Sequence, residues 1–184
     1  HLPRPDMTAL NGYHAWTLLK DSGYPIDQCV QVEALRYQYL DRHKYAIRKP
    51  FSNSTELKLL ILGDIQGRTT RQMIDCFEKA YFSLPFKVSV QIKPHPANPI
   101  DVADYSSFSP ILVDSSLIDL LTSVDCVLTS AFTAASLDVF CFGVPLINYV
   151  DPDNFNNSPL RGLLNTRFVS SQEEMLHLLQ DKHW

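Results

Sequence analysis

The stretch "LKLLILGD" (57–64) decides which fold this chain adopts. It is a short, nearly continuous apolar run that ends at Gly63, and such a run is typical of a strand buried on both faces. A strand of this kind belongs to a parallel sheet, because helices cover both faces of parallel sheets. The stretch therefore predicts an α/β protein, in which helices alternate with further short apolar strands.

The chain after this stretch shows the expected alternation. Residues 71–84 place Met73, Phe77, Ala80 and Leu84 on one face of a helix. Because strands and helices continue to alternate to the end of the chain, we expect βαβ units and a doubly wound, mainly parallel, Rossmann-like sheet. Further strands are predicted at 86–92, 110–114, 125–130, 144–150 and 167–171, and further helices at 117–124, 132–142 and 173–180.

The first 56 residues lack this regular rhythm. A helix is predicted at about residues 13–20, closed by Gly23 and Pro25, and residues 28–40 fit a strand that leads into a helical turn. Residue 1 is His rather than Met, so we expect the chain to be a piece of a longer protein.

These patterns predict three parts. Residues 1–40 are interpreted as the end of a preceding domain with its interdomain connection. Residues 41–56 are polar, charged and interrupted by Pro50, which is typical of a linker. Residues 57–184 form the main domain.

Composition limits the functions of the chain. Its 184 residues, 45% of them hydrophobic, suffice for one sizeable core, and a net charge of -4 argues against a nucleic-acid partner. The absence of a Lys/Arg run and of an apolar stretch near the ~20 residues of a membrane span allows at most peripheral membrane association. The four cysteines form no CxxC pair, which argues against a zinc cluster or disulfide framework and fits a cytoplasmic protein.

The corner "QIKPHPAN" (91–98) supplies the first candidate site. Pro94 and Pro96 restrict the backbone around Lys93 and His95, so both side chains would be held in place where a strand ends. Ligands of open parallel sheets bind outside the carboxyl ends of the strands, and a lysine with a histidine suits phosphate. The alternative is a surface turn whose charged side chains are merely solvated.

The segment 129–145 supplies the second candidate site. Thr129, Ser130 and Thr133 surround the predicted start of a helix, where free N–H groups and the helix dipole favour a phosphate, although such hydroxyls often just cap the helix. Asp138 lies in the otherwise apolar helix and could accept hydrogen bonds from ribose hydroxyls. Alternatively, Asp138 faces solvent or caps a loop.

The turn "GDIQGRTTR" (63–71) gives a weaker signal, in which Arg68 could reach a phosphate. It matches neither the G-x-G-x-x-G nor the Walker pattern, and the sequence contains no G-x-S-x-G, H-E-x-x-H or paired-carboxylate signature. We therefore expect no metal and no bound cofactor.

Taken together, "KPHP" (93–96), "TSAFTAASLD" (129–138) and "FGVP" (142–145) resemble the C-terminal nucleotide-sugar-binding domain of GT-B glycosyltransferases. In that superfamily an acidic residue is followed five positions later by Gly and seven later by Pro; in this chain the three positions are Asp138, Gly143 and Pro145. The nearest likeness is to bacterial surface-polysaccharide enzymes, namely sialyltransferases, Kdo transferases and CDP-glycerol polymerases.

The resemblance, which covers about residues 57–180, implies that Lys93 and His95 contact the donor phosphates and that Asp138 holds the ribose or another donor hydroxyl. Relatives often carry Glu where this chain has Asp138, and two serines where it has Thr133 and Ala134. The Ser/Thr motif that grips the phosphates in these enzymes corresponds to Thr129, Ser130 and Thr133.

The function implied is donor binding, with a cytidine- or uridine-linked sugar, in a cytoplasmic glycosyltransferase of cell-surface polysaccharide synthesis that is peripheral to the inner face of the membrane if it is attached at all. The other partners implied are a carbohydrate acceptor and the protein's own N-terminal Rossmann domain, which would supply the general base. This fragment alone would then be inactive. Alternatives are a nucleotide-sugar epimerase or glycerophosphate transferase of the same fold, or a non-catalytic module whose nucleotide cleft has decayed.

Overall fold

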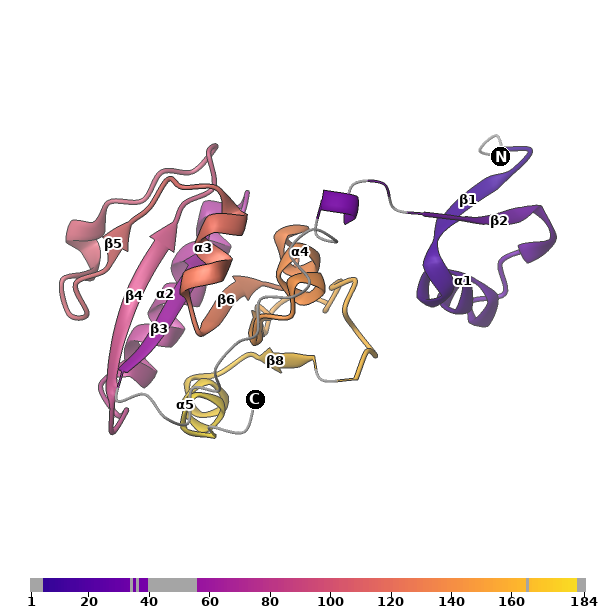
Figure 1. Ribbon diagram of the computed structural model, residues 1–184. Helices are drawn as coiled ribbons and strands as arrows, with labels where there is room; N and C mark the ends of the chain where they lie inside the picture. The colour runs from indigo at the N-terminus through magenta and orange to yellow at the C-terminus, as the bar shows by residue number, and fades with distance from the viewer. Residues whose placement is uncertain (1–4, 34, 36, 40–55, 165, 182–184) are drawn as a thin grey trace. The chain divides into compact units, whose positions relative to one another are not determined.

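The computed structural model describes residues 5–33, 35, 37–39, 56–164 and 166–181 (Figure 1). The chain falls into two compact units, residues 1–43 and 44–184. Residues 41–55 of the predicted linker lie outside the described residues. Glu56, the last residue assigned to that linker, instead begins the first strand of the second unit, where it is paired with Lys87.

The second unit is built on a six-stranded sheet in which every neighbouring pair of strands is parallel. The strand order is β5-β4-β3-β6-β7-β8, so the first strand of the unit lies in the interior and the chain winds outward from it in both directions. This is the strand order of a doubly wound Rossmann-like fold, which confirms the predicted fold class. The strands are β3 (Glu56–Leu62), β4 (Lys87–Lys93), β5 (Ile111–Leu112), β6 (Cys126–Ser130), β7 (Leu146–Tyr149) and β8 (Arg167–Val169).

Helices cover both faces of this sheet, and Figure 1 shows α3 in front of the strands and α2 behind them. Ser116 caps α3 by accepting a hydrogen bond from the N–H of Asp119, and Gly143 ends α4 in the left-handed conformation (φ 81°) that glycine adopts without strain. The helices are α2 (Gly67–Tyr81), α3 (Leu117–Ser123), α4 (Ala135–Phe142) and α5 (Gln172–Gln180), with a short 3₁₀ helix, η4 (Val102–Tyr105).

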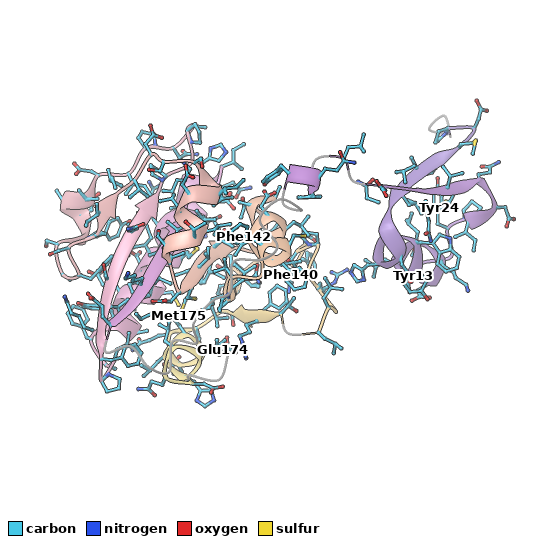
Figure 2. The ribbon with its side chains drawn as sticks, viewed as in Figure 1. Tyr13, Tyr24, Phe140, Phe142, Glu174 and Met175 are labelled. Carbon is cyan, nitrogen blue, oxygen red and sulfur yellow. The ribbon has the colours of Figure 1, made fainter. Side chains whose placement is uncertain are left out.

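Alternate strand residues divide the core between the two faces. One set packs with α2 and α5, and Figure 2 labels Met175, a fully buried member of this set on α5. The other set, which includes Leu60 and Leu62 of β3, is buried on the opposite face with α3 and α4. The α2/α5 cluster contains Leu57, Leu59, Ile61, Met73, Ile74, Phe77, Ala80, Val88, Val90, Ile92, Cys126, Leu128, Ile147, Tyr149, Val169, Met175 and Leu179, among others.

Several predicted boundaries were wrong. Helix α2 begins at Gly67, four residues before the predicted start, because the N–H of Thr70 already bonds to the carbonyl of Gln66. Lys93 was placed in the proline corner but is the last residue of β4, paired with Leu62. The strand predicted at 110–114 is reduced to β5. Helix α4 begins at Ala135 rather than at residue 132, because hydrogen bonds to Ser130 and Thr133 hold the intervening residues in a turn.

The first unit is a small βαβ arrangement. Strand β1 (Thr8–Asn11) is followed by helix α1 (Gly12–Asp21), a 3₁₀ turn η1 (Ile26–Gln28) and strand β2 (Cys29–Val32), which lies parallel to β1. A hydrogen bond of 3.2 Å joins the hydroxyls of Thr8 and Tyr24, the latter labelled in Figure 2. The helix predicted at about residues 13–20 is present as α1, and the strand predicted after it is present as β2.

None of the helices among residues 5–33, 35, 37–39, 56–164 and 166–181 has the length and apolar character needed to cross a bilayer.

The aromatic part of the core provides a test of the fold. Phe77 is fully buried, and its ring meets that of Phe108 edge-on, with centroids 5.4 Å apart. We expect Phe77→Ala to lower the free energy of unfolding by about 3–5 kcal/mol, because the lost contacts leave a cavity that the sheet and helices cannot fill. Urea denaturation followed by circular dichroism measures the change.

A matched control is Phe155→Ala, since this phenylalanine is 87% exposed. The control should alter the same free energy by less than about 0.5 kcal/mol. Equal effects of the two substitutions would contradict the assignment of Phe77 to the core.

Candidate functional site

The point where the strand order reverses lies between β3 and β6. From β3 the chain continues through α2 to β4 on one side, and from β6 it continues through α4 to β7 on the other. The connections that leave these two central strands, residues 63–66 and 131–134, therefore diverge at the carboxyl edge of the sheet. In doubly wound sheets this edge is where ligands bind.

A row of side chains crosses the sheet at this edge. Register pairs Lys93 of β4 with Leu62 of β3, Leu62 with Thr129 of β6, and Thr129 with Asn148 of β7. Paired residues of neighbouring strands point to the same face, which in this row is the face covered by α3 and α4. Lys93 and Thr129 are thus two strand spacings apart, about 10 Å.

The Lys/His corner lies at one end of this row. The Nζ atom of Lys93 is 3.8 Å from an oxygen of Asp114, whose side chain is fully exposed, so the ion pair holds the lysine only weakly. His95 is half-buried, and its Nδ1 accepts a hydrogen bond of 3.1 Å from the N–H of Ala97. In the neutral imidazole the proton must then lie on Nε2, which makes that atom a donor.

Close backbone packing fixes this corner against the end of β3. The N–H of Gly63 donates to the carbonyl of Lys93 at 2.9 Å. A Cβ atom at Gly63 would lie 2.8 Å from the backbone nitrogen of His95 and 3.2 Å from Cα of Pro94, so only glycine fits there. On the far side of the turn, the side-chain amide of Asn98 donates to the carbonyl of Ile65. The corner is therefore held against the β3–α2 turn at Pro94 and at Asn98.

The hydroxyl of Ser130 joins the two central strands. It is fully buried, donates to the carboxylate of Asp64 and accepts a hydrogen bond of 3.0 Å from the N–H of Phe132. The other oxygen of Asp64 accepts from the N–H of Gln66 at 2.7 Å. Ser130 was predicted as a phosphate ligand, but in this arrangement its hydroxyl tethers the two connections of the switch point.

Thr129 and Thr133 differ from Ser130 in their hydrogen bonds. Thr129 is fully buried, and within the described part of the chain its hydroxyl has no hydrogen-bond partner. Thr133 precedes α4, and its N–H and the N–H groups of Ala135 and Ser136 make only long hydrogen bonds of 3.3–3.4 Å. Bonds of this length are weak, so a phosphate could replace them.

Asp138 lies in the first turn of α4 and is 5% exposed. The alternative that it faces solvent is therefore wrong. The side chains of α4 differ in burial around the helix: Phe142 is buried, whereas Phe140 is 36% exposed (Figure 2). Asp138 is on the buried side, where a carboxylate needs hydrogen-bond donors.

Arg68 belongs to the first turn of α2 rather than to the turn before it, and its side chain is exposed. The structure thus gathers Lys93, Thr129 and Thr133 at the carboxyl edge, with His95 beside the end of β3. Arg68 is the candidate with least structural support.

Buried polar residues of this edge were also missed from the sequence, among them Asp64 and Asn148. Asp64 is 1% exposed, and Asn148 is fully buried with a side-chain oxygen that has no hydrogen-bond partner among the described residues. A signal for both existed, because each is a polar residue at the end of an apolar strand run. Asp64 directly follows Gly63 in the stretch that predicted the fold, and Asn148 interrupts "LINY" (146–149).

Burial also raises the pKa of one nearby tyrosine. Tyr149 is paired with Ser130 at the end of β7, and burial, with a smaller contribution from Cys76, raises the pKa of its hydroxyl to about 12. Tyr149, like an ordinary tyrosine, is protonated at neutral pH, and its raised pKa keeps it so in more alkaline solution. It can donate a hydrogen bond but does not serve as a base.

The first unit has a hollow of its own, of about 560 Å³, at the carboxyl ends of its two strands. This volume falls within the range of small-molecule sites. The residues that line it are Asn11, Gly12, Gln31, Val32, Glu33, Tyr37 and Gln38.

No group of three or more His, Cys, Asp or Glu side chains in the described ranges is arranged to hold a metal ion. Comparison of the chain with protein-family models and with curated proteins gave no match.

The contact at Gly63 yields a prediction. Gly63→Ala should lower the free energy of unfolding by about 2 kcal/mol, because the new methyl group meets backbone rather than a movable side chain. Gly67→Ala is the control: there the nearest atom is the side-chain oxygen of Asn98 at 3.0 Å, and alanine favours the helix. We expect a change of less than about 1 kcal/mol for the control. Thermal unfolding compares them, and equal midpoints would refute the close packing.

Proposed function

We propose that the second unit binds the nucleotide part of an activated sugar, as the donor-binding half of a glycosyltransferase that builds cell-surface polysaccharide in the cytoplasm. One observation carries the proposal. Lys93 belongs to the unit β3–α2–β4, whereas Thr129 and the start of α4 belong to the unit β6–α4–β7, yet all three lie along one edge of the sheet, beside its switch point. These are also the positions at which the sequence resembles the donor site of GT-B enzymes.

The chemistry of these groups suits a leaving phosphate. Loosely bonded N–H groups at the start of α4 and the positive end of its dipole attract an anion. Lys93 brings a mobile positive charge, and Nε2 of His95 brings a donor held in a rigid corner. Donors already in place lower the energy of the charge that develops as the sugar departs.

The acceptor belongs to the first unit in this proposal. The amide, carboxylate and phenol side chains around its hollow are the types that bind hydroxyl-rich ligands. The general base is assigned to the protein's N-terminal Rossmann domain, and none of the residues that line the hollow is given this role. The 184-residue chain is then expected to bind nucleotide without transferring sugar.

The direct test is calorimetric titration of the chain with CMP, CDP, UMP and UDP. We expect at least one of them to bind, and His95→Ala to weaken that binding about tenfold, because a hydrogen bond to a charged phosphate is lost. His177→Ala is a matched control, since this histidine is exposed on α5, outside the proposed site. Absence of binding, or equal affinity in both variants, would refute the proposal.

Asp138 has a separate test. If its carboxylate accepts a hydrogen bond from the ribose 2′-hydroxyl, the wild-type chain should prefer CMP to dCMP, or UMP to dUMP, by about tenfold. Asp138→Asn should reduce this ratio. Because the ratio is measured on a single protein sample, partial loss of folded protein does not alter it, and an unchanged ratio would remove Asp138 from the site.

A further inference from the structure

Two buried polar side chains lie next to each other on the sheet, and one oxygen of each is left without a hydrogen-bond partner. Thr129 of β6 and Asn148 of β7 are paired in register, and both residues are fully buried. Neither the hydroxyl of Thr129 nor the side-chain oxygen of Asn148 has a partner among the described residues. A buried polar atom without a partner lowers stability, so two such atoms side by side indicate a group that bonds to both.

The residues around the pair do not supply this group. On the same face of the sheet, register places Leu62 of β3 beside Thr129 and Phe168 of β8 beside Asn148, so hydrocarbon flanks the pair on both sides. Helix α4 packs on β6 and β7, and its first turn lies over their carboxyl ends because the helix starts at that edge of the sheet. The buried hydroxyl of this turn, on Ser136, donates at 2.8 Å to a backbone carbonyl just before the helix.

The amide of Asn148 has a defined orientation. Its Nδ2 atom donates to the carbonyl of Arg167 on β8 at 3.2 Å, so its oxygen is the atom that is left for another partner. An amide oxygen only accepts hydrogen bonds, whereas the hydroxyl of Thr129 can donate or accept. A group that is hydrogen-bonded to both residues must therefore carry a hydrogen that it can donate to Asn148.

This requirement selects among small occupants. An anion has no hydrogen to donate, and Asp138, on the buried side of the first turn of α4, adds a further acceptor rather than a donor. A metal ion takes about six oxygen ligands, more than this pair offers. A water molecule fits, because it donates to Asn148 and accepts from Thr129. Internal waters of proteins typically bridge buried polar groups in this way.

We propose that Thr129 and Asn148 hold one internal water molecule beneath the first turn of α4. The water joins the carboxyl ends of β6 and β7 where α4 begins to cross back over the sheet. Because the side chain of Thr129 is fully buried, it supports this turn from below through the water and does not touch a ligand. The proposal does not depend on the nucleotide site, in which Lys93, His95 and the N–H groups at the start of α4 keep the roles given to them above.

Thr129→Val tests the water by the sign of its effect on stability. Valine keeps the shape of threonine and removes the hydroxyl. With a water bound, the variant deprives that water of a hydrogen bond, and the midpoint of thermal unfolding should fall by about 3 °C. If instead the hydroxyl has no partner, its removal relieves a buried polar group. A midpoint that rises or stays the same would therefore overturn the proposal.

Val127→Thr is the matched control. Val127 is fully buried on the same strand and the same face, two residues before Thr129, and its neighbours in register are Leu60 and Leu146. The variant makes the reverse change of shape and polarity beside hydrocarbon, so the midpoint should fall. This fall measures the effect of an unpartnered hydroxyl on this face of the sheet.

A double variant tests whether the two residues share one partner. Asn148→Leu alone should lower the midpoint, in part because the bond to Arg167 is lost. In Thr129→Val/Asn148→Leu both polar groups are removed together, so the fall should be smaller than the sum of the two single falls. Additive falls would show that the two side chains have separate partners, and the proposal would then be wrong.

A crystal structure of the chain, at a resolution that shows ordered waters, identifies the shared partner. We expect one peak of density within about 3 Å of both Oγ1 of Thr129 and Oδ1 of Asn148. A direct hydrogen bond between the two side chains, with no such peak, would refute the proposal. Should Asn148→Leu fail to fold, the sign of the Thr129→Val effect and this density still decide.

Discussion

The whole second unit depends on the burial of β3 within the sheet. This strand pairs along its length with β4 and at its carboxyl end with β6, and its side chains are buried alternately against the α2/α5 layer and the α3/α4 layer. The backbone groups of its buried stretch, Leu59–Leu62, are shielded from water, so parallel ladders on both sides must satisfy them. Once β3 is placed this way, the two halves of the chain can only wind outward from it, and the switch point falls at its edge.

The candidate groups of the second unit lie around the carboxyl end of that strand. Gly63 lets the Lys/His corner approach the backbone of β3, and Asp64 ties the same strand end to Ser130 and, through it, to the turn before α4. The Lys/His corner and the turn before α4, which come from opposite halves of the fold, are thereby both held to β3. This coupling explains how short loops can form a site with little regular structure of their own.

The prediction from sequence succeeded where a residue's role follows from local pattern. The apolar run 57–62 identified β3, and Gly143 marked the end of α4, because burial on two faces and left-handed backbone each restrict the residue types allowed. It was less accurate where a non-local bond shifts a boundary. Lys93 became a strand residue through its pairing with Leu62. The hydrogen bond from Ser130 to Asp64 was not predicted, because these residues are 66 positions apart in the chain.

The sequence by itself determined the fold class, the alternation of elements and the edge at which the candidate residues would gather. These follow from hydrophobic periodicity, which is a property of each segment alone. The tertiary structure alone decided the strand order, the row that aligns Lys93 with Thr129, and the hydrogen bond that ties Asp64 to Ser130. The physical reason is that register and hydrogen bonds join residues distant in sequence, and the hydrophobic pattern of one segment carries no information about its partner.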